Sequence, residues 1–423
     1  MTPPFLHTPL RVLLVGSNLC RANEPYDAYG VSCLASAFKG SVANAGDTLE
    51  VFTFDLNRFQ DNTTGDYSIE WELIAEEIVT RVRIGRYNVV AFSVFGWFEK
   101  AVVLAGIRLA GLANPPFIML GGASIFGDEV QLHLRFPFAN MFTLSYGEKI
   151  FANMRHYINS GATRIMELPD FKSLQSPYLT GEIQIGGAID TVRAETRRGC
   201  SFRCSFCKHR DTISGKVYSF DNHERMLDEL KLFKSKGIKK LNVLDPLFND
   251  YKGHGEYYLK LIRKVGFDGK ITLQIRPEVL TESFMEEASL NPNVTFEIGV
   301  QSLDPAVLKV IQRGGKGTES QLREKLLRCK EFGISTMVTL IYGLPLQTYD
   351  SFARDIDIVK NYGVTKVGAF PLQVYPGTKL ADDIDKFGLT LHENAFGITE
   401  VAGTPFHDFE RMQALALNVG QIS

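Results

Sequence analysis

The sequence predicts an α/β protein in three parts: a doubly wound parallel sheet, an incomplete parallel β/α barrel and a small C-terminal cap. Apolar runs without alternation recur along the chain with amphipathic segments between them, which is typical of parallel strands covered on both faces. This rhythm pauses once, in a segment with prolines and glycines but no periodicity, and then resumes for six strand–helix units. A loop with three of the chain's six cysteines follows the first strand of the second series. The predicted parts are residues 1–160, the connection 161–190, the barrel 191–375 and the cap 376–423.

The first sheet rests on five apolar runs. Its strands are expected at residues 11–17, 49–54, 88–93, 117–120 and 141–144. Its helices are expected at residues 31–38, 71–84, 100–113 and from 148 to about 158. Ligands of such sheets bind beyond the carboxyl ends of the strands, so the loops that follow these strands are candidate binding segments.

The second series predicts the barrel. Its strands are expected at residues 191–196, 240–244, 271–275, 294–300, 335–341 and 367–371, and its clearest helices at 224–236, 257–265, 319–332 and 349–362. Ligands of β/α barrels gather at the C-terminal ends of the strands. The tail beyond Lys379 is expected to cover the barrel mouth, where His392, Glu393 and His407 are either substrate contacts or ordinary surface residues.

Composition excludes several classes of protein. With 423 residues and 45% apolar content, the chain can build two or three substantial cores. A formal net charge of −2 provides no electrostatic footprint for nucleic acid or an anionic membrane. No apolar run has the length of a membrane span, and the N-terminus lacks the pattern of a signal peptide. We therefore expect a cytoplasmic protein without nucleic-acid or membrane partners.

The cysteine loop predicts a metal centre at Cys200, Cys204 and Cys207. Soft thiolate ligands select iron–sulfur clusters or zinc. A structural zinc ion needs four protein ligands, and His209 is too close to Cys207 for the usual paired spacing. Three thiolates leave one corner of a 4Fe–4S cluster open, and an open corner can bind a substrate or cofactor.

Two plainer interpretations of these cysteines are a disulfide framework and a chance group of buried thiols. A disulfide framework belongs to small secreted domains rather than to a long, cysteine-poor chain. A chance group of buried thiols would not explain the close spacing. The other cysteines, Cys20, Cys33 and Cys329, are scattered and do not predict a second cluster.

The spacing Cys-x3-Cys-x2-Cys, with Phe206 just before the last cysteine, resembles the signature of the radical S-adenosylmethionine (SAM) superfamily. The resemblance implies that the open iron binds the amino and carboxylate groups of SAM. It also implies that an electron, from a donor such as flavodoxin or ferredoxin, cleaves the sulfonium to methionine and a 5′-deoxyadenosyl radical. That radical abstracts a hydrogen atom from an unactivated position.

The N-terminal sheet resembles the cobalamin-binding domain that is fused to many radical SAM enzymes. The resemblance rests on the order of its elements, above all on the serine after the third strand and the double glycine after the fourth. The implied cobalamin contacts are Asn18, Ser93, Trp97, Gly121, Gly122 and Gly147. The double glycine is expected to let a bulky ligand approach the backbone.

The sheet departs from that domain in one respect. Residues 8–132 contain no histidine, so the Asp-x-His-x-x-Gly motif that ligates cobalt is missing. A sheet that kept the shape but binds another nucleotide, or nothing, is the alternative. Methylthiotransferases of the superfamily carry three N-terminal cysteines for a second cluster, which Cys20 and Cys33 do not match.

In the barrel, polar residues share strand faces by period-two alternation: Gln274 with Arg276, and Glu297 with Gln301. The pattern Gly-Val-Gln ending at Gln301, with Arg313 and the later Leu-Ile-Tyr-Gly-Leu-Pro, resembles the oxygen-independent coproporphyrinogen dehydrogenases. The match implies that Gln301 and Arg313 contact SAM, Arg313 through the SAM carboxylate. A solvated helix residue is the alternative for Arg313.

That family has Glu at the position of Gln274 and Asp at that of Thr339, so the match is incomplete. Asp245 closes the second strand and is a candidate either for SAM contact or for orienting the cysteine loop. The candidate SAM contacts are therefore Phe206, Asp245, Gln274, Arg276, Glu297, Gln301 and Arg313.

These resemblances imply a cobalamin-dependent radical SAM enzyme that methylates an unactivated carbon of a small-molecule, natural-product substrate. The second hypothesis keeps the cluster and SAM and replaces methyl transfer by rearrangement, cyclisation or oxidation. The third is a non-catalytic iron–sulfur binding or sensing protein. The mass of the product separates the first two, and formation of 5′-deoxyadenosine separates both from the third.

Overall fold

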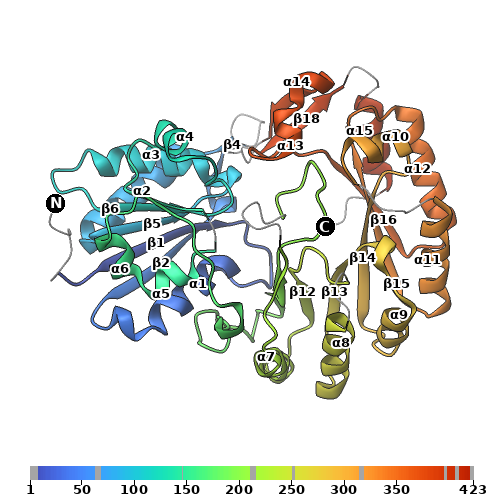
Figure 1. Cartoon of the computed structure of the whole chain (residues 1–423), viewed down its shortest axis with the longest axis horizontal. Coiled ribbons are helices and arrows are strands. Elements are labelled where there is room, and N and C mark those ends of the chain that lie inside the picture. Colours follow the sequence, from blue (N-terminus) through green and yellow to red (C-terminus); the bar gives the residue numbers. More distant parts are fainter. Residues whose placement is uncertain are drawn as a thin grey trace. The chain divides into compact units, whose positions relative to one another are not determined.

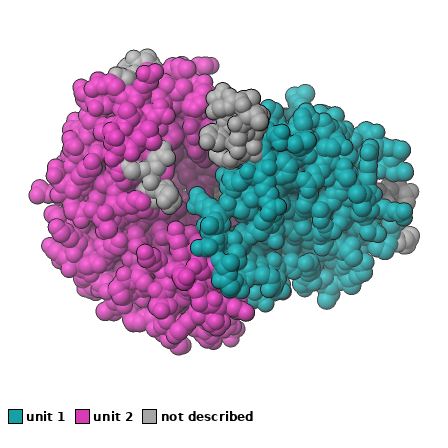
Figure 2. All heavy atoms as spheres, turned by 180° about the vertical axis from the view of Figure 1, so that it is seen from behind, with its two compact units in different colours: residues 1–189, 395–397 teal, residues 190–394, 398–423 magenta. Residues whose placement is uncertain are grey.

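The computed structural model describes residues 8–61, 68–144, 146–209, 216–249, 253–313, 319–394, 398–404 and 409–419. The described residues divide into two compact units, one ending at Ile189 and one beginning at Asp190, coloured teal and magenta in Figure 2. In each unit a six-stranded parallel sheet is covered by helices (Figure 1). The predicted α/β fold with two successive parallel sheets is confirmed.

The sheet of the first unit has the strand order β2-β1-β5-β6-β7-β8. Its strands are β1 (Arg11–Asn18), β2 (Thr48–Asp55), β5 (Val89–Ser93), β6 (Phe117–Gly121), β7 (Met141–Thr143) and β8 (Arg164–Ile165). The chain goes from β1 to β2 on one side and then crosses to β5 on the other. Ligands of doubly wound sheets bind at such a switch point, beyond the carboxyl ends of the strands. The short β8 lies in the segment that the sequence predicts to be a connection.

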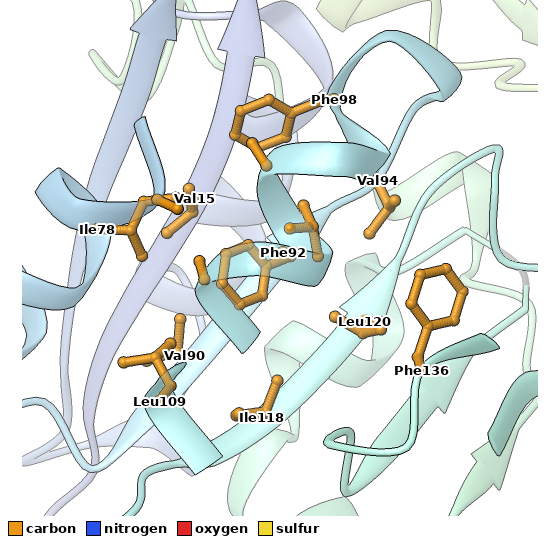
Figure 3. Packing of buried hydrophobic residues seen from close by; sticks show 14 of the residues in the cluster. Val15, Ile78, Val90, Phe92, Val94, Phe98, Leu109, Ile118, Leu120 and Phe136 are labelled. Atoms are coloured by element: carbon orange, nitrogen blue, oxygen red, sulfur yellow. The ribbon is translucent and has the colours of Figure 1, made fainter. Parts of the chain in front are cut away.

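Helices cover both faces of this sheet. One core contains Val90, Phe92 and Leu120 (Figure 3). The core on the opposite face contains Val89 and Ala91. Neighbouring residues of β5 are therefore buried on opposite faces, which explains an apolar run without alternation.

The helices of this unit are α1 (Tyr29–Lys39), α2 (Trp71–Gly85), α3 (Glu99–Ala110), α4 (Glu129–Arg135), α5 (Glu148–Ala152) and α6 (Met154–Asn159). Short elements complete it: a hairpin of β3 (Gln60–Asp61) and β4 (Ser68–Ile69), and 3-10 turns at Val42–Asn44, Leu56–Phe59, Gly96–Phe98 and Phe171–Ser173. The sequence did not predict α4 or the hairpin, because both are too short to show a period.

The sheet of the second unit is an open barrel. Its strands follow chain order: β9 (Thr191–Ala194), β12 (Lys240–Val243), β13 (Lys270–Ile275), β14 (Val294–Gln301), β15 (Ser335–Tyr342) and β16 (Lys366–Pro371). The helices that follow these strands are α7 (His223–Ser235), α8 (His254–Val265), α9 (Glu282–Ser289), α10 (Pro305–Val310), α11 (Glu319–Glu331) and α12 (Tyr349–Asn361). The sequence predicted helices between these strands but gave no bounds for α9 and α10, which are again short.

The two faces of this barrel sheet differ in polarity. Along β14, Val294, Phe296, Ile298 and Val300 are buried on the helix side and alternate with half-buried Thr295, Glu297, Gly299 and Gln301. The same alternation in β13 leaves Gln274 exposed. Because one face is apolar and covered while the other is polar and accessible, the polar inner face is where a ligand can bind.

The C-terminal elements pack on the barrel. They are α13 (Lys379–Asp382), α14 (Ile384–Phe387), the hairpin of β17 (Thr390–Glu393) and β18 (Thr399–Gly403), and α15 (Phe409–Val419). Leu380, Leu389 and Val401 form one buried cluster with Val307 and Ile311 around α10. In the described part of the chain, no helix combines the length and apolarity that a membrane crossing requires.

Candidate functional site

The cysteine loop begins directly after β9 and turns back through a short antiparallel pairing of β10 (Arg197–Arg198) with β11 (Tyr218–Ser219). Gly199 has φ +83°, and a Cβ at this position would lie 2.4 Å from the carbonyl oxygen of Lys216. Only glycine fits both the left-handed conformation and the close approach. Gly199 thus allows the turn that brings Cys200 into the loop.

The middle of the loop is held from two sides through Ser205. The Ser205 backbone N–H donates to the Ile311 carbonyl at 2.8 Å, and the Leu380 N–H donates to the Ser205 carbonyl at 2.9 Å. Phe206 packs against the apolar cluster that contains Ile311 and Leu380. The end of α10 and the start of the C-terminal cap therefore fix the backbone between Cys204 and Cys207.

Cys200, Cys204 and Cys207 are half-buried and make no disulfide. Burial raises the pKa of the Cys207 thiol to about 11, and the neighbouring Cys204 and Cys200 act in the same direction. Bound metal must replace these protons, because the thiolate is the ligand. The disulfide interpretation is thus not supported within the described residues.

Among the described residues, no three His, Cys, Asp or Glu side chains converge on a single metal ion. A cluster does not need this convergence, because it takes each sulfur at a different iron corner. The buried Ser205 hydroxyl, only 6% exposed, also has no hydrogen-bond partner in the described chain. Three soft sulfurs in a glycine-dependent loop, with an unsatisfied hydroxyl between two of them, fit an iron–sulfur cluster.

Arg276, which the sequence predicts as a SAM contact, lies against this loop. Its guanidinium carbon is 3.5 Å from the centre of the Phe202 ring, and its Nη1 donates to the Cys204 Sγ at 3.6 Å. Its Nε and Nη2 donate to the Glu278 carboxylate at 3.3 and 3.0 Å. All three of these nitrogens are therefore engaged by the protein.

Glu278 is the anion of this group. Burial alone would raise its pKa, but the hydrogen bonds from Arg276 and the charge of Arg313 outweigh burial, so the pKa lies below its ordinary value. Glu278 and Arg313 also line a cavity of about 440 Å³ that reaches Leu308 and Leu322. The site thus holds one carboxylate between two cations.

Gln301 and Arg313 meet at Gly299. Arg313 donates to the Gly299 carbonyl oxygen, and a Cβ on Gly299 would lie 2.6 Å from the Gln301 amide nitrogen. Arg313 is only 9% exposed, so it is not the solvated helix residue of the alternative interpretation. Gln301 has φ +70°, an uncommon conformation for a residue with a side chain. The bulge between Gly299 and Gln301 turns this amide back over the inner face.

Gln274 and Glu297 are register partners on neighbouring strands of that inner face. Burial raises the pKa of Glu297, and the charge of Lys240 acts against this shift. The structure therefore places Gln274, Glu297 and Gln301 on one accessible polar surface. Arg276 lies beyond the end of β13, against the loop.

Asp245 is fully buried beneath the loop. It accepts hydrogen bonds from the backbone N–H groups of Thr196 and Arg197 at 2.7 and 3.1 Å, and from the Thr196 hydroxyl. The Thr196 hydroxyl also contacts the His254 Nε2 at 2.7 Å. Of the two roles that the sequence left open for Asp245, its contacts match the orientation of the cysteine loop.

In the first unit, the switch point between β1 and β5 brings Ser17, Asn18 and Ser93 to one edge. The Asn18 side chain donates to the carbonyls of Tyr26 at 3.0 Å and Pro25 at 3.4 Å, which closes the loop after β1. The buried Ser17 hydroxyl has no hydrogen-bond partner among the described residues. A buried hydroxyl without a partner at the expected ligand position fits a bound group that supplies one.

The double glycine at this edge packs against protein. Gly122 has φ +106°, and a Cβ there would lie 2.6 Å from the Val94 carbonyl oxygen. A Cβ on Gly147 would meet the Leu34 side chain at 2.9 Å, whereas a Cβ on Gly121 would make an ordinary 3.5 Å contact with Thr143. The close approach at Gly122 thus joins two loops, while Gly122 itself stays exposed at this edge of the sheet.

Trp97 lies in the turn after β5 and stacks on Phe95, with ring centres 4.8 Å apart and planes 10° apart. The pair forms a flat aromatic surface, and Trp97 also packs against the core. At this place Trp97 can either contact the face of a ligand or serve only to pack the protein.

Several residues of the site were not predicted from the sequence. They are Phe202, Ser205, Glu278, Thr196 and His254. Phe202 could have been predicted, because an aromatic side chain between Cys200 and Cys204 must lie close to the metal-binding loop. The others are brought to the loop by tertiary structure.

Comparison with known proteins agrees with this geometry. The model of the radical SAM superfamily matches residues 195–359. The ribosomal protein uS12 methylthiotransferase RimO of Carboxydothermus hydrogenoformans is 29% identical over 43% of this chain and 43% of its own length. The cobalamin-dependent radical SAM methyltransferase TokK of Streptomyces tokunonensis is 27% identical over 77% of this chain and 53% of its own. The chain thus spans about half the length of these curated relatives.

Two solved structures of the radical SAM methyltransferase TsrM of Kitasatospora setae share the fold. The complex with tryptophan and a SAM analogue aligns with a TM-score of 0.67 and 18% identity, and covers 89% of this chain and 76% of TsrM. The complex with cobalamin and a 4Fe–4S cluster aligns with a TM-score of 0.64 and 16% identity, and covers 90% of this chain and 75% of TsrM.

The residues matched by the radical SAM superfamily model contain the three-cysteine loop and strands β12 to β15 of the barrel. The two TsrM alignments cover 89% and 90% of the chain, so the similarity of fold extends to both units. The predicted radical SAM domain is therefore confirmed, and the alignments agree with the predicted fold of the first unit.

Proposed function

We propose that this protein is a cobalamin-dependent radical SAM methyltransferase that acts on an unactivated carbon of a small molecule. The observation that carries the proposal is the three-cysteine loop at the carboxyl end of the first barrel strand, in a chain whose other unit is a doubly wound sheet. The names of TokK and TsrM support methyl transfer, and the tryptophan in one TsrM complex supports a small substrate.

In this proposal Cys200, Cys204 and Cys207 hold a 4Fe–4S cluster. When bound, the cluster supplies the electron that cleaves SAM, and cobalamin supplies the methyl group. The chain's part is to orient the cluster loop, through Asp245 below it and Ser205 in its middle. The electron comes from a separate one-electron donor of the flavodoxin or ferredoxin class.

SAM is held in this proposal where Gln301 and Arg313 meet at Gly299. A guanidinium fork matches the SAM carboxylate, and the amide can both donate and accept. Gln274 and Glu297 face the accessible side of the same strands, where they can contact SAM or the substrate.

Cobalamin is held in this proposal at the switch point of the first sheet. Ser17, Asn18 and Ser93 supply polar contacts there, and Trp97 supplies a flat apolar one. Because residues 8–132 contain no histidine, the cobalt is not ligated by a histidine of the loop after β1.

The likeness to RimO raises methylthio transfer as a second candidate. The first unit holds two cysteines, and Cys33 is buried on α1, 5% exposed. Cys20 is half-buried in the loop after β1. This pair does not match the three-cysteine set of a second cluster, so we favour methyl transfer.

The proposal is tested by anaerobic incubation of the reconstituted protein with SAM, cobalamin, a reductant and candidate small molecules. We expect 5′-deoxyadenosine and S-adenosylhomocysteine together, and a product heavier by one CH₂ unit. Cys204→Ala should abolish 5′-deoxyadenosine, whereas Cys329→Ala, which removes a buried thiol on α11, should retain it. A product with the same mass as the substrate would favour rearrangement. Formation of the methylated product in the absence of cobalamin would contradict the proposal.

A further inference from the structure

We propose that Arg276, with Glu278 as its counter-charge, sets the reduction potential of the cluster by donating to the Cys204 ligand. The inference rests on the proposed function, because it requires a 4Fe–4S cluster on the cysteine loop. It gives Arg276 a role at the cluster in place of the SAM contact that the sequence suggests.

The backbone of Arg276 is fixed before its side chain is considered. The Arg276 N–H donates to the Asn249 side-chain oxygen at 3.0 Å, and the Asn249 amide donates to the Arg276 carbonyl at 2.9 Å. Asn249 follows β12, so this pair of bonds joins the ends of β12 and β13. Pro277 then starts a 3-10 turn and restricts the chain further.

The guanidinium is fixed on three sides. Its flat face lies over the Phe202 ring, one edge holds Glu278 through Nε and Nη2, and Nη1 points at the Cys204 sulfur. The side chain is 7% exposed. A planar fork can make these three contacts at once, whereas a lysine ammonium cannot.

Pairing with Glu278 alone would satisfy a buried arginine, so the orientation of the third nitrogen toward sulfur is the informative feature. A donor to a ligand sulfur stabilises the reduced cluster, which carries one more negative charge. Buried positive charge has the same effect, and it is strong where water is excluded. Arg276 therefore favours uptake of the electron, and Glu278 opposes it.

The test measures the midpoint potential of the reconstituted holoprotein by an EPR-monitored redox titration under anaerobic conditions. The variants are Arg276→Gln, Arg276→Lys and Glu278→Gln. Arg263→Gln is the matched control, since Arg263 pairs with Glu287 at the surface of α8 and α9. Iron and sulfide are assayed in each sample, so that potentials are compared only between loaded proteins.

For Arg276→Gln we expect the equilibrium constant for accepting the electron to fall at least tenfold. The midpoint potential should therefore be more negative by at least about 59 mV, the value for one electron. Arg276→Lys should lie between this variant and the wild type, because the charge remains but the fork is lost. Glu278→Gln should shift the potential in the opposite, positive direction. Arg263→Gln should not shift it.

The opposite signs make the inference falsifiable even if one variant fails to assemble. An unchanged potential in loaded Arg276→Gln overturns the inference, as does a lost affinity for SAM without any shift. If Arg276→Gln binds no cluster, Glu278→Gln decides, since a positive shift supports the role and no shift excludes it. Failure of the proposed function looks different, because the wild-type protein itself would then bind no cluster.

Discussion

Thr196 links two buried ionisable side chains beneath the cysteine loop. Its hydroxyl contacts both the Asp245 carboxylate and the His254 Nε2. Burial lowers the pKa of His254 to about 4, and the charge of Arg197 adds to this shift. The folded protein therefore keeps this histidine neutral at a pH where the unfolded chain would protonate it.

The lowered pKa of His254 predicts that the stability of the protein depends on pH. The His254 contribution is fully present above its ordinary pKa of about 6.5 and is lost as the pH falls toward 4, because protons bind the unfolded chain first. We expect the wild type to lose about 2 kcal/mol relative to His254→Gln between pH 7 and pH 5. Urea unfolding followed by circular dichroism at both pH values measures this difference.

His392→Gln, at an exposed histidine of β17, is the control and should keep the wild-type dependence. Burial raises the pKa of Asp245 to about 6, and its contribution, lost as the pH rises through 6, has the opposite sign. Asp245 is present in both proteins, so the comparison isolates the histidine. A wild type and His254→Gln that respond equally to pH would contradict this interpretation.

At the residue scale, the sequence predicted the three cysteines because their spacing is local. It did not predict what each polar residue contacts. Gln274 and Arg276 do share a strand parity, but Arg276 lies beyond the last residue of β13, where the chain turns toward Phe202. His254 and Thr196 are 58 positions apart, and only the pairing of β9 with β12 brings them together.

At the element scale, the edge of the first sheet depends on one glycine. Gly122 combines a left-handed backbone with the close approach of the Val94 backbone, both of which a side chain would disrupt. Its neighbour Gly121, at the end of β6, has neither constraint. The two glycines therefore differ in how well each position would tolerate a side chain.

We expect Gly122→Ala to lower the free energy of unfolding of the first unit by about 2–3 kcal/mol, because either the backbone or Val94 must shift. Gly121→Ala should stay within about 1 kcal/mol of the wild type. Both tryptophans, Trp71 and Trp97, lie in this unit, so their fluorescence in a urea titration reports its unfolding. Equal effects of the two substitutions would show that the approach to Val94 is unimportant.

The sequence predicted strands and long helices well, because their apolar periods span many residues. The predicted strands of both sheets agree with the structure to within about three residues. The short α4 and β8 were missed, and α9 and α10 were predicted without bounds, since so few residues show no period. The sequence singled out Gly122 as a glycine that a ligand could approach, but its close approach to Val94 arises only from the pairing of β5 with β6.

At the scale of the whole molecule, the protein consists of two units with one candidate cofactor site in each. In the second unit, the loop with the cysteines is held by elements from β12, α10 and the cap, which are separated along the chain. Cluster binding should therefore depend on an intact second unit as well as on the three sulfurs.

The most direct test of the central claim is an iron and acid-labile sulfide analysis of the anaerobically reconstituted protein. We expect about four irons and four sulfides per chain in the wild type, and loss of the cluster when Cys200, Cys204 and Cys207 are together replaced by alanine. A wild-type protein without iron, or a triple variant that still holds a full cluster, would contradict the assignment of this loop.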